Sequence, residues 1–186
     1  MIKRQTTKEL IAASLKDLSK QKSMDKITVK EITQNCGLTH TTFYNHFKDK
    51  YDLIVWIYYT SVEKIVNKIG KDGYEWRNAV FDSVKYSVDN RKFLINAIMH
   101  TSGQNSFINN ISNINIKILS NYIKVNNNLN TLPQDVEVLL KIYVYGTVCM
   151  LCEWLITKMP ISVEKFVHLL ENGLPEPLKP YLYKND

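Results

Sequence analysis

The densest group of side chains able to recognise another molecule lies between Thr39 and Phe47. A helix over these residues would turn Phe43 and Phe47 inward and leave one polar face open. That face carries His40, Thr41, Thr42, Tyr44, Asn45 and His46. Its members donate or accept hydrogen bonds and include no acid, so a phosphate-rich groove could receive them. We therefore expect this helix to enter a major groove, where asparagine suits the edge of adenine.

Two lysines follow this face. Lys50 falls in the first turn of a helix that Asp49 would cap, where the helix dipole disfavours a cation. A bound phosphate would reverse that cost, because the free amides and the lysine would hold it together. The alternative is that Lys50 simply extends into water. We favour phosphate contact, because Tyr44 and Lys48 lie close in sequence.

The elements before this face form a helix-turn-helix pattern. Thr28 and Glu31 have the spacing of a capping box, which opens a short helix. Gly37 can adopt a left-handed conformation and end that helix, and Thr39 can cap the next one. A first helix over about 7–20, capped by Thr6 or Thr7, would provide the packing surface. The residues expected to bury against it are Ile32, Leu38, Phe43 and Phe47.

The charge is concentrated in the same part of the chain. Of 186 residues, the first 50 include ten Lys or Arg and five Asp or Glu, whereas the remainder includes fourteen and thirteen. A basic first quarter indicates an anionic partner. The N-terminus lacks the apolar centre of a signal peptide, no stretch reaches eighteen uncharged apolar residues, and three cysteines are too few for a disulfide framework. We expect a soluble, cytoplasmic protein that does not enter a membrane.

The sequence lacks the patterns of a catalytic or metal-binding site. The sequence offers no phosphate loop, nucleophile motif or carboxylate pair with a clear role, so an enzyme is not expected. Cys149 and Cys152 have C-x-x-C spacing, but they lie inside an apolar helical pattern and are expected to pack in the core. No second Cys/His pair has the spacing of zinc ligands, and neither a metal nor a cofactor is expected.

Helical periodicity continues through the rest of the chain. Helices are expected at about 49–69, 76–89, 93–100, within the Asn-rich segment 103–130, and at 135–158 and 162–172. The helix over 135–158 carries two adjacent apolar stripes, so it must be covered on nearly all sides. We expect a second subunit to cover one of them, and Gly146 would permit a close helix crossing. The alternative is a fully buried helix in a monomer.

The expected dimer interface is the first of these stripes together with the final helix. It comprises Val136, Leu140, Tyr143, Thr147, Met150, Trp154, Phe166 and Leu170. The second stripe comprises Leu139, Ile142, Gly146 and Cys149.

Three segments together resemble the DNA-binding domain of TetR-family transcriptional regulators. They are Thr28-Val29-Lys30-Glu31-Ile32, Cys36-Gly37-Leu38-Thr39, and Thr42-Phe43-Tyr44-Asn45-His46-Phe47-Lys48-Asp49-Lys50-Tyr51-Asp52-Leu53. The last segment is similar to the Firmicutes branch that includes activators of dihydroxyacetone kinase operons. The resemblance covers about 7–54 and departs from the family at Lys22-Ser23-Met24, where a glycine is frequent, and at His40.

The resemblance implies an all-α homodimer that binds a palindromic operator on double-stranded DNA. It divides the chain into a three-helix DNA-binding domain, 1–48, and a helical sensing and dimerisation domain, 49–186. The DNA-binding set is Thr28, Thr39, His40, Thr41, Thr42, Tyr44, Asn45, His46, Lys48 and Lys50.

The function expected from the sequence is therefore transcriptional regulation, with repression favoured over activation. A small ligand or a protein would act as effector at the C-terminal domain. Six aromatic residues are suited to line a pocket, and each could equally belong to the core: Trp76, Phe81, Tyr86, Phe107, Tyr122 and Tyr143. The alternative is a helical protein-interaction adaptor whose basic quarter serves only solubility.

Overall fold

The computed structural model describes residues 5–103 and 106–183, and these form α-helices and short 3-10 helices. In chain order they are α1 (Thr7–Leu18), η1 (Met24–Lys26), α2 (Val29–Asn35), α3 (His40–Tyr44), α4 (Lys50–Val66), α5 (Trp76–Asp89), α6 (Arg91–Met99), α7 (Phe107–Asn126), α8 (Gln134–Ile156), α9 (Val163–Asn172), η3 (Glu176–Leu178) and α10 (Lys179–Leu182). The all-α prediction is confirmed.

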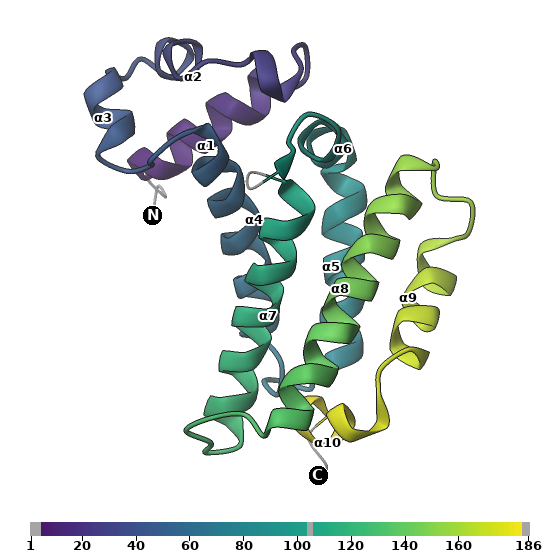
Figure 1. The fold of residues 1–186 in the computed structure, drawn as a ribbon. Coiled ribbons are helices and arrows are strands. Elements are labelled where there is room, and N and C mark those ends of the chain that lie inside the picture. Colours follow the sequence, from purple (N-terminus) through teal and green to yellow (C-terminus); the bar gives the residue numbers. More distant parts are fainter. Residues whose placement is uncertain (1–4, 104–105, 184–186) are drawn as a thin grey trace.

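Helices α1, α2 and α3 make a small unit at one end of the molecule, which we call the head (Figure 1). Its centre consists of apolar side chains without solvent exposure, among them Ile11, Leu15, Ile32 and Phe43. Both α1 and α2 begin with a complete capping box, Thr6 with Glu9 and Thr28 with Glu31. Local signals therefore start the helices, and burial of their apolar stripes holds them together.

Helix α4 leads from the head into the larger helical unit, which we call the core (Figure 1). Asp49 caps its start, with Oδ1 accepting from the amides of Tyr51 and Asp52 at 2.8 Å. The helix packs against α1 near its start and against α7 and α5 further along. The predicted link between the two units is present, although it ends at Val66 rather than near residue 69.

In the core, α4, α5, α7 and α8 run roughly alongside one another, and α9 lies beside α5 and α8 (Figure 1). Helix α6 lies between the head and this bundle. The Asn-rich segment forms α7 from Phe107 to Asn126 and a loop after it; Asn105, at its start, lies outside the described residues. Its apolar stripe includes Ile111, Ile118 and Ile123, all buried.

Two features differ from expectation. The third helix ends at Tyr44, and a turn continues to Phe47, whose amide still donates to the carbonyl of Phe43 at 2.9 Å. After Gly173 the chain forms η3 and α10, which bury Leu178 and Leu182.

Helix α8 is long and apolar enough to cross a membrane by length and composition alone. The core helix of a soluble protein meets the same two criteria, and eight residues of α8 are buried within this chain.

Candidate nucleic-acid interface

The turn between α2 and α3 aims the recognition face. Gly37 has φ +68°, the left-handed region, and the next amide, that of Leu38, donates to the carbonyl of Thr33 at 2.9 Å. Thr39 then caps α3, its Oγ1 accepting from the amide of Thr42 at 3.1 Å. Phe43 is fully buried in the head, so the opposite side of α3 faces outward. The helix-turn-helix and both predicted caps are present.

Most of the predicted DNA-binding residues lie on or beside α3, whereas Thr28 caps α2 and Lys50 begins α4. Those whose side chains are exposed are Thr28, Thr39, His40, Thr41, Tyr44, Asn45 and Lys48, while Thr42, His46 and Lys50 are half-buried. Tyr44 is 56% exposed, whereas the side chain of Phe43 before it is fully buried. The rings of His40 and Tyr44 meet edge to face with centroids 6.4 Å apart, so the two side chains stand next to each other on one helix face.

Three of these hydroxyl groups already make hydrogen bonds within the chain. Thr28 Oγ1 donates to Glu31 Oε2 at 2.9 Å, and the hydroxyls of Thr39 and Thr42 are 2.9 Å apart. By contrast, the side chains of Thr41 and Asn45 make no hydrogen bond to any residue that the structure describes. Thr41 and Asn45 could therefore contact base edges without first breaking a bond, as could His40 and His46, whose side chains make no hydrogen bond to a described residue either.

Lys50 has a role that its sequence position did not reveal. Its Nζ donates to the carbonyl oxygens of Asp25 and Ile27, at 2.7 and 2.8 Å, at the connection between η1 and α2. These carbonyl dipoles offset the unfavourable position of a cation at a helix start. Partial burial lowers the pKa of Lys50. The charged amine of Lys50 therefore holds the loop that contains Thr28, and one of its three N–H groups remains to donate to another acceptor.

The residues predicted for the dimer interface are largely buried inside the single chain, which corrects that expectation. Val136, Leu140, Tyr143, Trp154 and Phe166 are each at most 8% exposed. The rings of Trp154 and Phe166 stack within the subunit at 4.5 Å. Thr147 and Leu170 are half-buried, and only Met150 is exposed. The stripe predicted to meet a partner is instead the one that packs on α5, α7 and α9, because both stripes of α8 are apolar and periodicity does not distinguish them.

The opposite side of α8 is apolar and open. We call it the α8 face; it comprises Val138, Ile142, Tyr145, Gly146, Cys149, Met150 and Ile156. Ile142 is 61% exposed and Met150 is 50% exposed. A Cβ built at Gly146 would meet nothing within 4 Å. Its members recur every three or four residues from Val138 to Met150, and the exposed Glu153 separates them from Ile156.

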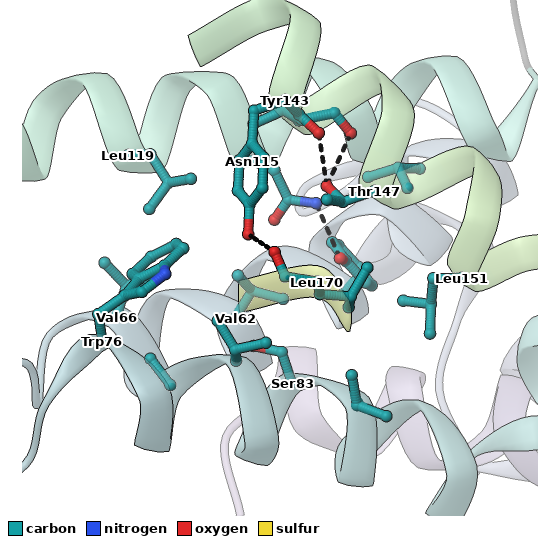
Figure 2. A pocket seen from close by; sticks show the side chains of 16 residues that line it. Val62, Val66, Trp76, Ser83, Asn115, Leu119, Tyr143, Thr147, Leu151 and Leu170 are labelled. Atoms are coloured by element: carbon teal, nitrogen blue, oxygen red, sulfur yellow. Dashed lines mark hydrogen bonds between the residues drawn. The ribbon is translucent and has the colours of Figure 1, made fainter. Parts of the chain in front are cut away.

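A cavity of about 100 Å³ lies between α4, α5, α7, α8 and α9 (Figure 2). Among the described residues, its lining is mostly valine and leucine and includes no charged side chain. Trp76 lies on one side, with Asn115, Tyr143 and Thr147 across from it. Trp76 is 5% exposed, and its Nε1 is buried without a hydrogen-bond partner among the described residues. Asn115 Nδ2 donates to the hydroxyl of Tyr58 at 2.9 Å, and the Tyr143 hydroxyl donates to the Leu170 carbonyl at 3.0 Å.

Of the six aromatic residues proposed for a pocket, Trp76 and Tyr143 line this cavity. Phe81 is 37% exposed, and the others belong to the packing elsewhere. The two cysteines of the C-x-x-C spacing separate: Cys152 is buried, as expected for core packing, but Cys149 is exposed on the α8 face. Burial raises the pKa of the Cys152 thiol to about 12. Asn115 and the unpaired Trp76 nitrogen could not have been found by sequence pattern, because only the packing of five helices brings them together.

Two family models match the chain. Residues 10–55 match bacterial regulatory proteins of the tetR family, and residues 74–175 match a transcriptional regulator C-terminal region of the same family. The second match alone covers more than half of the chain. The first ends just inside α4, close to the junction between head and core.

A curated relative and two solved structures are similar to the chain. The HTH-type dhaKLM operon transcriptional activator DhaS of Lactococcus lactis is 30% identical over 87 residues, a match that spans 47% of this chain and 46% of that protein. The structure of a dihydroxyacetone kinase operon activator DhaS has a TM-score of 0.64 and 22% identity, covering 90% of this chain and 93% of its own. A TetR transcriptional regulator from Streptococcus agalactiae has a TM-score of 0.62 and 16% identity, covering 91% and 94%.

The structural likeness establishes the fold, and the family models establish the relationship. Regulators of this family bind DNA operators and act as dimers. The chain belongs to the TetR family of transcriptional regulators.

Proposed function

We propose that this chain binds a palindromic operator as a homodimer and thereby regulates transcription. The observation that carries the proposal is the outward side of α3, which follows the turn at Gly37. Its exposed side chains can form hydrogen bonds, and none of them is acidic. In this arrangement Thr41 and Asn45 contact base edges, with Asn45 suited to adenine. Tyr44 and Lys48 contact phosphates and fix the register.

Selection of bound sequences from random duplex DNA tests this directly. Asn45→Ala is expected to change the preferred bases, whereas Lys48→Ala is expected to weaken binding to all sequences and reduce the salt slope by about 1. Lys50→Ala provides the comparison: because the Lys50 amine holds the loop before α2, it should lower the stability of the head more than the salt slope. Failure to enrich any sequence at physiological salt would support the adaptor alternative instead.

The homodimer is proposed to form through the α8 face, with a second copy of the chain as the occupant. Regulators of this family act as dimers. Without a partner, the apolar side chains of the α8 face would be exposed to water. Gly146 lies within it and would allow two α8 helices to approach closely. The α9 residue Leu169, 51% exposed, would extend the contact.

Sedimentation of two charge variants tests this assignment. Ile142→Glu places a carboxylate within the α8 face of each subunit, and the dissociation constant should rise at least about 100-fold, which corresponds to roughly 3 kcal/mol. Val125→Glu is the matched control, because Val125 is also exposed, at 67%, but lies on α7 outside the α8 face. An Ile142→Glu dimer as tight as the control would refute this interface.

The cavity is proposed to hold the effector. Because none of the described residues that line it is charged, a charged ligand would lose its hydration without compensation. Its volume of about 100 Å³ is of the same order as the ~150 Å³ of an apolar cavity that accepts benzene, so a ring of about that size is the upper limit. The ligand class that fits is therefore a small, neutral, largely apolar molecule with one hydrogen-bond acceptor for Trp76 Nε1.

Cyclopentanone and cyclopentane form a suitable pair of probes, because they share a ring and differ in the carbonyl acceptor. Cyclopentanone should raise the melting temperature of the protein more than cyclopentane does. Trp76→Phe removes the donor and keeps an aromatic ring, so it should abolish that difference. Equal shifts by both compounds in the unmodified protein would show that the indole nitrogen does not select the ligand, and no shift would leave a protein effector as the alternative.

The direction of regulation is a separate question. Repression is expected from the sequence, whereas the curated relative is an activator, which favours activation. A reporter gene behind the selected operator distinguishes the two by the sign of its response to the protein. In either case the chain is proposed to act in the cytoplasm, where operator DNA is found.

A further inference from the structure

One side chain of the core reaches into the backbone of the head. Asn96 belongs to α6, and its Oδ1 accepts from the amide of Met24 at 2.7 Å. Its Nδ2 donates to the carbonyl oxygens of Ser19 and Lys22, at 3.0 and 2.8 Å. Asn96 thus satisfies three backbone groups where α1 ends and the chain turns toward η1. Both amide functions of the side chain are in use.

Other contacts join α6 to the head on both sides of Asn96, and they include Lys16 Nζ, which lies 5.7 Å from the centre of the Phe93 ring. Lys16 Nζ in α1 donates to Asn90 Oδ1 at 3.1 Å. After the end of α6, His100 Nδ1 lies 3.5 Å from Asp25 Oδ1. His100 and Asp25 are both more than 40% exposed, so this contact contributes little. Asn96 makes the most hydrogen bonds of these links, three of good length.

The other side of α6 is attached to the core. Arg91 Nε and Nη2 both donate to the carbonyl oxygen of Leu155, at 2.9 and 2.6 Å, in the last turn of α8. Phe93, Leu94 and Ala97 are buried. Figure 1 shows α6 between the head and the helices of the core. Helix α6 therefore moves with the core, and its contacts with the head restrain the head relative to that core.

We propose that Asn96 is a positioning residue that fixes the orientation of the head on the core, and so sets the separation of the two recognition helices in the dimer. The inference rests on the proposed binding of a two-half-site operator. The covalent connection through α4 does not by itself fix every rotation of the head. Once one head is bound, the effective concentration of the second is highest when it is already held at the separation of the second half-site.

Comparison of one and two half-sites separates this role from a purely structural one. Affinity is measured for the selected operator, for a duplex with one half-site, and for operators whose half-sites are moved by one or two base pairs. Asn96→Ala should bind the single half-site as the unmodified protein does. It should bind the full operator about tenfold more weakly, and its preference among spacings should be broader. Asn96→Asp keeps the size and one acceptor but loses both donors, so it should change affinity in the same direction.

Two controls identify the source of any change. Asn126→Ala removes another asparagine that bonds to a carbonyl, that of Tyr122 within α7, and it should leave all duplexes unaffected. Lys22→Ala removes the pair with Glu31 inside the head, without touching the link to α6, and should not broaden the spacing.

The outcomes are distinct. If Asn96→Ala lost affinity equally for one and for two half-sites, the side chain would only support the loop after α1. If it kept full affinity and an unchanged preference among spacings, the side chain would not restrain the head. Either result overturns the inference. If the unmodified protein bound no selected duplex, the proposed function itself would fail, and this inference with it.

Discussion

The backbone at Gly37 offers a strong test of how the head is built. Its φ of +68° lies in the left-handed region, and a Cβ added there would meet nothing within 4 Å. Gly37→Ala is therefore opposed by backbone strain alone, about 1–2 kcal/mol for an L-residue in this region. Alanine also restricts the unfolded chain, which offsets about 0.4–1 kcal/mol of that cost. The net loss of unfolding free energy should be about 1 kcal/mol.

Urea denaturation followed by circular dichroism measures this loss, at a fixed protein concentration because dimerisation adds to stability. With a slope of about 2.5 kcal/mol per molar urea, the midpoint should fall by about 0.4 M and the slope should not change. Gly37→Asn should lose less, because asparagine tolerates the left-handed region better than alanine does.

Gly173→Ala provides a control of opposite sign. Gly173 also ends a helix, but its φ is −77°, and its added Cβ would lie at ordinary contact distance, 3.4 Å, from the carbonyl of Leu169. Alanine there should be neutral or stabilise by up to about 1 kcal/mol. A loss well above 2 kcal/mol for Gly37→Ala, or the same sign and size at both glycines, would refute the assignment of the cost to backbone conformation.

Three other predictions concern the α8 face and the start of α2. A thiol reagent such as DTNB should modify Cys149 quickly and Cys152 slowly, because burial raises the pKa of the Cys152 thiol to about 12. If the α8 face is the dimer interface, the rate of Cys149 modification should fall as the protein concentration rises, and a constant rate would contradict that interface. Gly146→Ala should strengthen α8 by about 1 kcal/mol but weaken dimerisation measured by sedimentation, whereas unchanged association would argue against a close crossing. The hydrogen bond from Lys22, together with those from the start of α2, lowers the pKa of Glu31 from 4.5 to about 2. The stabilising effect of the Glu31 carboxylate is therefore complete above pH 4.5 and is lost as the pH falls toward 2, and Glu31→Gln should remove this part of the acid dependence of the urea midpoint.

The head could be predicted well because its signals are local. The capping box of Thr28 and Glu31, the left-handed Gly37 and the cap at Thr39 each involve residues within a few positions of one another. Such signals are readable from sequence, since backbone geometry at a helix end depends on nearby side chains. The same holds for the outward set on α3, which follows once Phe43 is known to face inward.

Features that depend on distant contacts could not be predicted. The partners of Lys50 are carbonyl groups more than twenty residues earlier in the chain, so its position at a helix start indicated an anion instead. Asn96 gave no signal, because its three partners belong to another unit. The 3-10 helix η3 and the short α10 were missed for a related reason: too few residues share a period for a stripe to be recognised.

The choice between the two stripes of α8 shows the physical limit most clearly. A helix that is apolar on nearly all sides needs two partners, but its sequence does not assign either stripe to either partner. In the structure Val144 and Val148 turn toward the cavity, and Ile142 and Tyr145 turn outward. A close-packed helix moves as a unit, so a ligand that displaces the cavity side of α8 also displaces the α8 face. If the proposed cavity and dimer are both correct, ligand binding and dimerisation must be linked, and each must change the affinity of the other by the same factor.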